Sequence, residues 1–172
     1  VRVDNHELQA DHILIATDGR PTVPDMPGAR LGITSDEFFE LGHQPQSTLV
    51  VGAGYIATEL AGVLNSLGNE VTMLVRKKTL LKEFDATLGE TLMTEMRAAG
   101  IKILTEVRLQ EIRTEPDGTL SIFHDADQTT TGFDSVLWAI GREPLTADLN
   151  LDHAGVRVDT EGFIPTDKYQ CT

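Results

Sequence analysis

The sequence predicts an α/β domain with a small parallel sheet and an additional antiparallel β-meander. Short β-branched apolar runs alternate with segments of helical period, glycine-rich turns separate them, and a hairpin turn replaces the helices in the second half. A length of 172 residues corresponds to one domain, or to one domain with additions from a neighbour. Because the chain starts at Val1 in the middle of a pattern, we expect it to be part of a longer protein.

Composition excludes several function classes. The chain has 14 Lys and Arg against 27 Asp and Glu, and a net charge of −13 disfavours binding to nucleic acid. No apolar run approaches the roughly 18 residues of a membrane span, so we expect no membrane partner. Cys171 is the one cysteine, which excludes an intrachain disulfide or a CxxC metal site and indicates a free surface thiol.

The first elements are a strand and a long connection. Residues 13–16 read ILIA and predict a buried strand, which ends in a tight turn at Asp18-Gly19-Arg20-Pro21. The region from 21 to 45 then holds prolines at 21, 24, 27 and 45 without a sustained period. We therefore expect a connection there.

A βαβ unit follows. Residues 48–51 predict a strand that leads into Gly52-Ala53-Gly54, and residues 71–75 predict the next strand. Between them, apolar residues recur at helical spacing, and Gly68-Asn69 marks the end of the helix. The helical positions are Ile56, Leu60, Val63, Leu64 and Leu67. Two strands connected in this way are expected to be parallel, with a right-handed crossover.

The next elements are a second helix and a third parallel strand, and a hairpin follows them. Asp85 is a candidate N-cap for a second helix with one apolar face, Gly100 ends that helix, and residues 101–104 predict a third parallel strand. The expected apolar face consists of Leu88, Leu92, Met96 and Ala99. The segments 107–114 and 120–124 flank the turn sequence EPDG and predict a hairpin, and residues 133–140 predict one more strand.

The glycine turn carries the chemistry. Gly52-x-Gly54-x-x-Ala57, placed between a strand and a helix, is the fingerprint of a Rossmann-like FAD/NAD(P)-binding domain. The first glycine permits the tight turn, Gly54 lets the backbone approach a pyrophosphate, and the first helical residues, Tyr55, Ile56 and Ala57, present N–H groups at a positive helix terminus. A glycine turn without a ligand is the alternative interpretation.

A basic cluster follows the second strand of this unit. Val75 precedes Arg76, Lys77 and Lys78, and Lys82 is close behind. An NAD site carries an acidic residue about 20 positions after its glycines to bind the ribose 2′-hydroxyl, whereas this cluster suits a 2′-phosphate. We therefore expect NADPH rather than NADH, with Arg76 as the main ligand because a guanidinium binds phosphate in bidentate fashion. A solvated basic loop is the alternative.

Two further candidates lie on the first helix. Tyr55 and Glu59 both sit away from the centre of the predicted apolar stripe, and Glu59 is expected to be half-buried on its flank. Considered alone, Tyr55 is also compatible with a packing aromatic residue and Glu59 with a surface salt bridge.

The stretch VVGAGYIATELAGVLNSLGNEVTMLVRKKTLLKEFD resembles the NADPH-binding domain of the pyridine nucleotide-disulfide oxidoreductase family. The flanking segments ILIATDGRP, VLWAIGREP and DKYQCT extend the resemblance over essentially the whole chain. In that family NADPH gives a hydride to FAD, and FAD reduces a cysteine pair that in turn reduces a disulfide. The resemblance implies glutathione disulfide as the substrate, a homodimeric parent enzyme and a cytoplasmic location.

The resemblance also implies roles for single residues. Tyr55 matches a catalytic tyrosine that covers the flavin until the nicotinamide displaces it, and Glu59 matches a catalytic glutamate that orients the nicotinamide and pairs with a lysine of the FAD domain. Arg76 matches an arginine that binds the 2′-phosphate, and Lys82 stands where a second arginine is common, so we expect it to bind more loosely.

Gly141 and Arg142 complete the cofactor-binding set that the resemblance implies. Arg142 matches an arginine near the cofactor at a domain junction, although it could instead have a structural partner. The domain boundaries expected are 1–21 for a strand and junction from the flavin domain, 22–143 for the NADPH-binding domain, and 144–172 for a segment that returns to the flavin domain.

Two departures from the family pattern limit these implications. Asp18 replaces a glycine in the first junction, which is tolerable at a positive φ only with some strain and puts a contact to FAD in doubt. The FAD-binding glycine motif, the redox cysteine pair and the interface domain are missing from these residues, so this chain alone is not expected to reduce a disulfide. Other NADPH-dependent reductases, of mercuric ion or trypanothione disulfide, remain alternatives.

A nucleotide-sensing module without chemistry of its own is an alternative from another class. The two junctions that contain Gly-Arg and proline, at 19–21 and 141–144, argue against it, because a separate sensor has no need of hinges toward a flavin domain.

Overall fold

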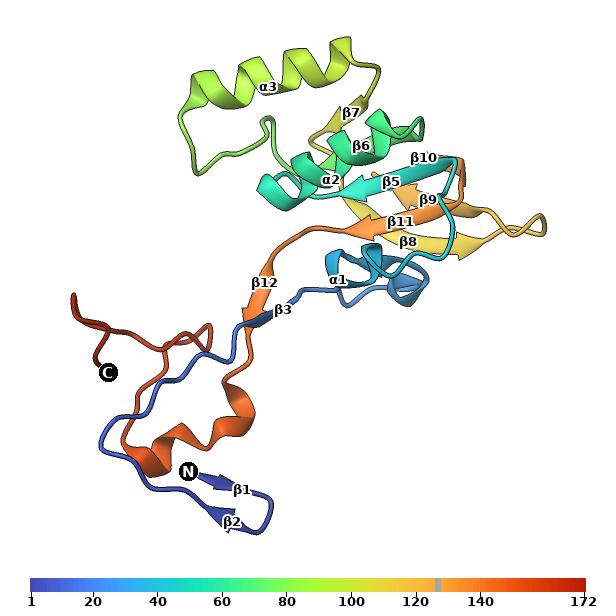
Figure 1. The fold of residues 1–172 in the computed structure, drawn as a ribbon. Helices are drawn as coiled ribbons and strands as arrows, with labels where there is room; N and C mark the ends of the chain where they lie inside the picture. Colours follow the sequence, from blue (N-terminus) through green and yellow to red (C-terminus); the bar gives the residue numbers. More distant parts are fainter. Residues whose placement is uncertain (126–127) are drawn as a thin grey trace. The chain divides into compact units, whose positions relative to one another are not determined.

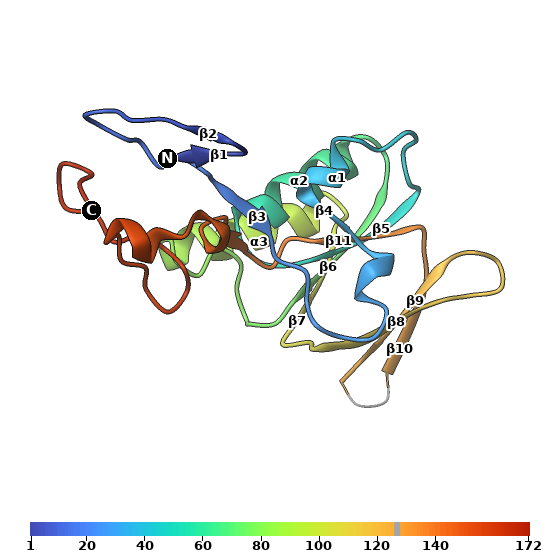
Figure 2. The ribbon, with the colours of Figure 1, turned by 90° about the horizontal axis from the view of Figure 1, so that it is seen from below.

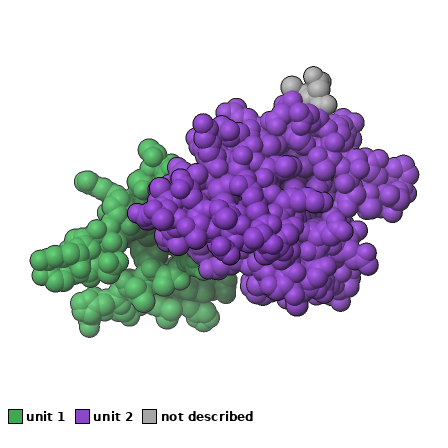
Figure 3. Space-filling view, turned by 90° about the horizontal axis from the view of Figure 1, so that it is seen from above, with its two compact units in different colours: residues 1–20, 143–172 green, residues 21–142 purple. Residues whose placement is uncertain are grey.

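The computed structural model describes residues 1–125 and 128–172, which divide into two compact units. Unit 1 consists of Val1–Arg20 and Glu143–Thr172, and unit 2 consists of Pro21–Arg142 (Figure 3). Unit 2 is one uninterrupted stretch of chain, whereas unit 1 is formed from two stretches that flank it in the sequence.

A parallel sheet runs through unit 2. Among the described residues it has five strands in the order β4-β11-β5-β6-β7 (Figure 1 and Figure 2). They are β4 (Ile33–Thr34), β5 (Ser47–Val51), β6 (Glu70–Val75), β7 (Lys102–Thr105) and β11 (Ser135–Trp138). Val50 pairs in parallel with Met73 on β6 and with Leu137 on β11. The predicted parallel sheet is confirmed, with β5, β6 and β7 close to the expected positions.

Two predicted helices connect these strands. α2 (Tyr55–Ser66) follows β5, and α3 (Ala86–Ala98) follows β6. The Oδ1 of Asp85 accepts a hydrogen bond from the N–H of Thr87 at 2.8 Å, which confirms the predicted N-cap. The predicted apolar face of α3 is confirmed in part. Met96 is buried and Leu92 packs against the core, whereas Leu88 is 48% exposed and Ala99 is exposed. The buried face also includes Gly89, which lies against the backbone of residue 80.

An antiparallel meander follows the parallel strands. β8 (Leu109–Thr114), β9 (Leu120–His124) and β10 (Gln128–Phe133) form a sheet in the order β10-β9-β8, which confirms the predicted hairpin. The strand predicted over 133–140 is confirmed over Ser135–Trp138, which forms β11, whereas Phe133 ends β10. Asp134 separates β10 from β11, because its carboxylate accepts hydrogen bonds from the N–H groups of Gln46 and Ser47 and turns the chain into the parallel sheet.

The core of unit 2 has two halves, one on each face of the parallel sheet. Val50, Met73 and Leu137 pack with α2 and α3, whereas Leu49 and Leu74 pack with the meander. This division follows from the alternation of side chains along a strand. Unit 2 is therefore a three-layer structure of helices, parallel sheet and meander (Figure 2).

The connection expected between residues 21 and 45 contains structure that the sequence did not reveal. It includes η1 (Ala29–Leu31), β4 at the edge of the sheet, and α1 (Ser35–Phe38). Thr34 and Glu37 form a capping box at the start of α1, in which the N–H of Thr34 donates to Glu37 Oε2 at 2.7 Å. The expectation of a connection without secondary structure was therefore wrong. These elements have two to four residues each, which is too short for a hydrophobic period to show in the sequence.

Unit 1 contains short elements and no buried core. They are β1 (Arg2–Val3), β2 (His6–Glu7), η2 (Ala147–Leu149) and η3 (Leu151–Ala154). β3 (Gly19–Pro21) and β12 (Arg142–Pro144) pair at the two chain crossings between the units. The buried strand predicted for residues 13–16 is wrong, because these residues form no strand and Leu14 is 88% exposed. No described strand pairs with this segment, and a strand requires such a partner for its backbone groups.

Candidate functional site

The predicted site residues follow the carboxyl ends of neighbouring parallel strands. The glycine turn follows β5, Arg76 and Lys77 follow β6, and Gly141 and Arg142 follow β11. Because β11, β5 and β6 are adjacent and parallel, these three segments lie at one edge of the sheet (Figure 1). In open α/β sheets this edge is where ligands bind.

The two glycines of the turn have different surroundings. Gly52 has φ +148°, and a Cβ there would lie 2.1 Å from the carbonyl oxygen of Ala139. Gly54 has φ −83°, and a Cβ there would meet nothing within 4 Å. Gly52 is therefore required by the protein's own packing, whereas the position of Gly54 leaves room for an approaching ligand.

The start of α2 is open to an anion. Gly54 is its N-cap, no side chain caps it, and its first turn contains no acidic residue. The first intrahelical bond runs from the N–H of Thr58 to the carbonyl oxygen of Gly54, so the N–H groups of residues 55–57 have no partner within the helix. Tyr55 is 56% exposed, Ile56 is partly buried, and Ala57 is buried.

Glu59 differs from the expectation. The residue is exposed rather than half-buried, because the buried face of α2 is centred on Ala57, Ala61 and Leu64. Position 59 is about 200° around the helix from position 57 and so faces solvent. Within the described chain, no cation lies within ion-pair distance of Glu59.

The basic segment contains paired and unpaired cations. Lys82 Nζ lies 3.0 Å from Glu83, and Lys78 Nζ lies 4.0 Å from Glu106. Arg76 and Lys77 are exposed, and neither has an ion-pair partner among the residues that the structure describes. The two cations nearest the end of β6 are therefore the ones available to a phosphate.

Arg142 has a structural partner. Its Nη1 lies 3.6 Å from Asp36 Oδ1, and its side chain is 32% exposed. Asp36 is the second residue of α1, which directly follows β4, and β4 is adjacent to β11. The preceding Gly141 has φ +146°, and its carbonyl oxygen accepts a hydrogen bond from the N–H of Thr22 at 2.9 Å. The turn at 141–142 is thus held by residues of the segment that begins unit 2.

Asp18, in unit 1, adopts the conformation that the junction was expected to require. Its φ is +58°, a left-handed value that a side chain makes costly. Its Oδ1 accepts a hydrogen bond from the N–H of Gly19 at 2.7 Å, which helps an aspartate to occupy this region.

Some residues of this edge were not predicted. The carbonyl oxygen of Ala53, in the glycine turn, accepts a hydrogen bond from the N–H of Leu81 at 2.8 Å, and Asp36 pairs with Arg142. The capping box at Thr34 and Glu37 was a readable signal for the helix that carries Asp36. No local signal pointed to Leu81, because its role depends on a residue that lies on another loop.

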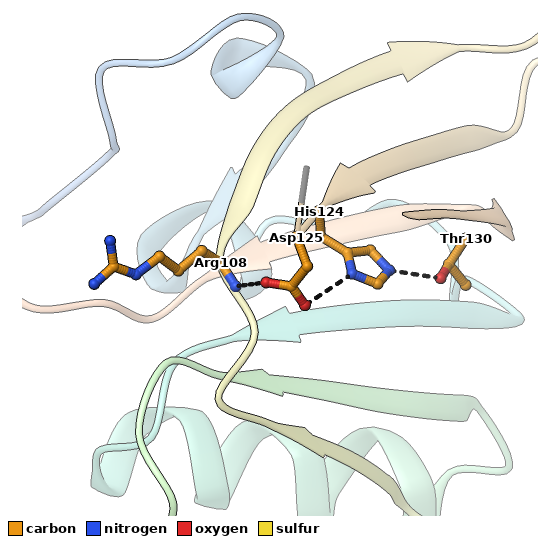
Figure 4. Close-up of polar contacts among 4 residues, drawn as sticks. All are labelled: Arg108, His124, Asp125 and Thr130. Carbon is orange, nitrogen blue, oxygen red and sulfur yellow. Dashed lines mark hydrogen bonds and ion pairs between the residues drawn. The ribbon is translucent and has the colours of Figure 1, made fainter. Parts of the chain in front are cut away.

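One buried histidine lies outside this edge, in the meander. His124 is 4% exposed, and its Nε2 lies 3.1 Å from Thr130 Oγ1 on β10 (Figure 4). Its Nδ1 lies 3.4 Å from Asp125 Oδ2, and Asp125 Oδ1 accepts a hydrogen bond from the N–H of Arg108. Both ring nitrogens therefore have partners, and the array joins the segments before β8, at the end of β9 and on β10.

Other kinds of site find no support in the part of the chain that is described. No group of three or more His, Cys, Asp or Glu side chains there could hold a metal ion. None of the described helices has the length and apolar character needed to cross a bilayer. Cys171 is exposed and forms no disulfide.

Comparison with known proteins identifies relatives along the whole chain. The family model "Pyridine nucleotide-disulphide oxidoreductase" matches residues 1–172. Glutathione reductase of Yarrowia lipolytica is 40% identical over 163 residues, which cover 94% of this chain and 35% of the relative. Glutathione reductase of Schizosaccharomyces pombe is 43% identical over 167 residues, which cover 96% of this chain and 36% of the relative.

The chain is also similar to solved structures of a flavoprotein disulfide reductase. The HOCl-induced flavoprotein disulfide reductase RclA from Escherichia coli has a TM-score of 0.82 at 26% identity, covering 91% of this chain and 36% of that one. A Cu(II) complex of the same protein has a TM-score of 0.80 at 26% identity, covering 89% and 35%. The chain thus spans about a third of the length of the proteins it matches.

Proposed function

Since the chain belongs to the pyridine nucleotide-disulphide oxidoreductase family, we propose that unit 2 is the NADPH-binding domain of a flavin-dependent disulfide reductase. The observation that carries this proposal is the start of α2. An uncapped helix terminus follows a glycine with open space around it, and the unpaired Arg76 and Lys77 follow the adjacent strand. This arrangement fits a pyrophosphate at the helix and a phosphorylated ribose at the cations.

The chemistry supplied by the bound groups is a hydride transfer, in which two electrons and a proton leave NADPH and are accepted by FAD. The residues of this chain bind and orient the donor. The N–H groups of residues 55–57 and the positive end of α2 neutralise the pyrophosphate. Arg76, which can form two parallel hydrogen bonds to one phosphate, binds the 2′-phosphate, and Lys77 adds a positive charge.

Three further residues are assigned by their matches to the family. Tyr55, exposed on the first turn of α2, would cover the flavin in the absence of the nicotinamide. Glu59 orients the nicotinamide and pairs with a lysine outside this chain, which agrees with an exposed carboxylate. Arg142 contributes a cation at the junction, where Asp36 fixes its position. Lys82, already paired with Glu83, binds more weakly than Arg76.

Unit 1 fits a role as part of the flavin domain. Residues 13–16 are apolar but exposed, and no described residue supplies a strand beside them. We assign residues 1–21 and 144–172 to the flavin domain, whose remaining parts would supply that strand. One cysteine is present in residues 1–172, so the redox pair must come from elsewhere in the parent protein, and this chain alone is inactive as a reductase.

Glutathione disulfide is the substrate that we propose for the parent enzyme. Both curated relatives at 40% and 43% identity are named glutathione reductase. Reduction of mercuric ion or trypanothione disulfide is the alternative, because the family resemblance assigns no residue of this chain to the choice of the disulfide. By the same family resemblance, the parent is a cytoplasmic homodimer.

A nucleotide-sensing module is a second candidate of a different class. The pairing of β3 with β12 argues against it, because a structured double crossing to a second unit serves a domain that works with a neighbour. Addition of NADPH to the full-length protein separates the two: bleaching of the FAD absorbance indicates a reductase, and its absence indicates a sensor.

The first prediction tests the 2′-phosphate assignment. Arg76→Glu replaces an unpaired cation by an anion, so NADPH should bind at least about 100-fold more weakly while NADH loses much less. Calorimetric titration of the chain with both nucleotides, at low and moderate salt, measures this. Wild-type binding of NADPH should be tighter and more salt-dependent than that of NADH.

A matched control is Arg97→Glu, the same substitution near the end of α3 and away from the glycine turn. It should leave the preference for NADPH intact. Equal losses of NADPH and NADH affinity in Arg76→Glu would contradict the assignment of that residue to the 2′-phosphate.

A further inference from the structure

Two backbone hydrogen bonds attach the basic segment, residues 76–82, to its surroundings. The N–H of Leu81 donates to the carbonyl oxygen of Ala53 at 2.8 Å, and the N–H of Glu106 donates to the carbonyl oxygen of Lys77 at 3.2 Å. Ala53 belongs to the glycine turn after β5, and Glu106 follows β7. The segment that carries the cations is therefore tied to the ends of both strands that flank β6.

Both donors have costly backbone conformations. Leu81 has φ +50° and Glu106 has φ +63°, a region that residues with a side chain seldom occupy. Leu80 is 1% exposed and belongs to the core formed with Met93 and Met96 of α3. Such conformations persist only where surrounding contacts stabilise them. The segment 76–82 is therefore held in one backbone conformation.

α3 lies against this segment at Gly89. A Cβ at position 89 would lie 2.6 Å from the carbonyl oxygen of Leu80, closer than Cβ atoms come to other atoms in proteins. Glycine is unfavourable inside a helix, and Gly89 is buried in the interior of α3. The close approach to Leu80 is the reason that the structure provides for a glycine there.

We propose that Gly89 and Leu81 are positioning residues for the 2′-phosphate of NADPH. They fix the course of the segment 76–82, and with it Arg76 and Lys77, although neither is required to touch the nucleotide. The proposal rests on the proposed function of unit 2. It implies that the preference for the phosphorylated nucleotide depends on the packing of α3, outside the binding site itself.

The test uses the full-length protein and oxidised nucleotides, which bind without transferring a hydride. Gly89→Ala pushes Leu80 away and displaces the segment, so the Kd for NADP⁺ should rise about tenfold, the equivalent of losing one charge-assisted hydrogen bond. The Kd for NAD⁺, which lacks the 2′-phosphate, should stay within about twofold. Calorimetry measures both constants, and hydrogen exchange at the amide of Leu81 should become faster.

The matched control is Gly62→Ala, the same change inside α2, where a Cβ would meet nothing within 4 Å. It should leave both constants and the exchange rate unchanged. If Gly89→Ala does not fold, Leu81→Pro tests the same attachment, because proline can neither donate the hydrogen bond nor adopt a positive φ. It should produce the same selective loss of NADP⁺ affinity.

The outcomes separate this proposal from the one on which it rests. A wild-type protein without a preference for NADP⁺ overturns the proposed function, and the positioning role with it. A wild-type preference that survives unchanged in folded Gly89→Ala and Leu81→Pro variants overturns the positioning role alone. An equal loss of NADP⁺ and NAD⁺ also overturns it, since the displaced segment would then affect more than the phosphate.

Discussion

At the scale of single residues, Gly52 and Gly54 show why one motif can serve two purposes. A Cβ at position 52 would collide with the carbonyl oxygen of Ala139, on the neighbouring strand end, whereas a Cβ at position 54 would extend into open space. The first glycine is needed to build the sheet edge, and the second is needed only if a ligand comes close. Substitutions at the two glycines therefore test two different properties, folding at Gly52 and ligand binding at Gly54.

The glycine pair leads to a prediction that separates folding from binding. Gly52→Ala should destabilise the protein by at least ~2 kcal/mol, because alanine is strained at φ +148° and also meets Ala139. Gly54→Ala should change stability by less than about 0.5 kcal/mol yet weaken NADP⁺ binding at least tenfold. Urea denaturation and calorimetry measure the two effects. Undiminished nucleotide binding by Gly54→Ala would show that no pyrophosphate passes this position.

Titration of single carboxylates in the β8–β9 hairpin predicts a pH dependence. Hydrogen bonds from Arg113 to Glu111, aided by the positive charge of Arg113, hold the pKa of Glu111 below its ordinary value of 4.5. Hydrogen bonds from the hydroxyl and N–H of Thr119 similarly lower the pKa of Asp117. A lowered folded-state pKa stabilises the fold above the unfolded-state pKa, and this contribution is lost as the pH falls through the folded-state value.

We therefore expect the urea midpoint to fall as the pH drops below about 4.5. The change should be small, because Asp117 is exposed and the Glu111 side chain is still 30% exposed. Glu111→Gln should reduce this dependence, whereas Glu90→Gln, which removes an exposed carboxylate on α3, should not. A Glu111→Gln protein with an unchanged acid limb would mean that the pair with Arg113 does not contribute to stability.

At the scale of elements, the sequence predicted those whose signals are local. β5, α2, β6, α3, β7 and the β8–β9 hairpin all have a period or a turn sequence of their own, and each appears near its expected place. β4 has two residues and no period, and the division at Asp134 depends on hydrogen bonds to Gln46 and Ser47, distant in the sequence. The apolar run at 13–16 has strand character, but no described strand pairs with it.

In the candidate site, too, the sequence predicted the features with local signals and missed the contacts between distant residues. The glycine turn and the basic cluster are contiguous patterns, so the sequence revealed them. The pair of Asp36 with Arg142 and the contact of Gly89 with Leu80 join separate elements, and only the folded chain brings them together. The burial of Glu59 was wrongly expected because the buried face of α2 is set by the sheet beneath it.

The meander provides a prediction about how its strands are held together. Replacing His124 by leucine removes the contacts to Asp125 and Thr130 and leaves the partly buried Thr130 without a partner, so unit 2 should lose about 1–3 kcal/mol. Urea denaturation monitored by the fluorescence of Trp138, which is 1% exposed, measures the change. Thr130→Val, which removes one of the two contacts, should cost less than His124→Leu; the reverse order would contradict this account.

At the scale of the whole molecule, the two units differ in what holds them together. All residues of both core clusters lie within Pro21–Arg142, whereas none of the described residues of unit 1 is buried. The stability of the chain therefore resides in unit 2.

We accordingly expect residues 21–142 to fold without unit 1. Their urea midpoint should match that of the whole chain within experimental error, and limited proteolysis of the whole chain should cleave unit 1 first. A matched control, residues 21–106, lacks the meander and β11 and should show no cooperative transition. Loss of cooperativity in residues 21–142 would show that unit 1 contributes to the core after all.

The placement of unit 2 between the two parts of unit 1 also sets an order of events during synthesis. Arg20 pairs with Glu143, 123 positions later in the chain. At about 5–20 residues per second, a ribosome needs roughly 6–25 s to cover that distance. During this interval the apolar residues 13–16 have no strand partner among the described residues. Unit 2 is made as one continuous piece and can fold first, so we expect chaperones that recognise apolar nascent chains to bind residues 1–20 during this interval.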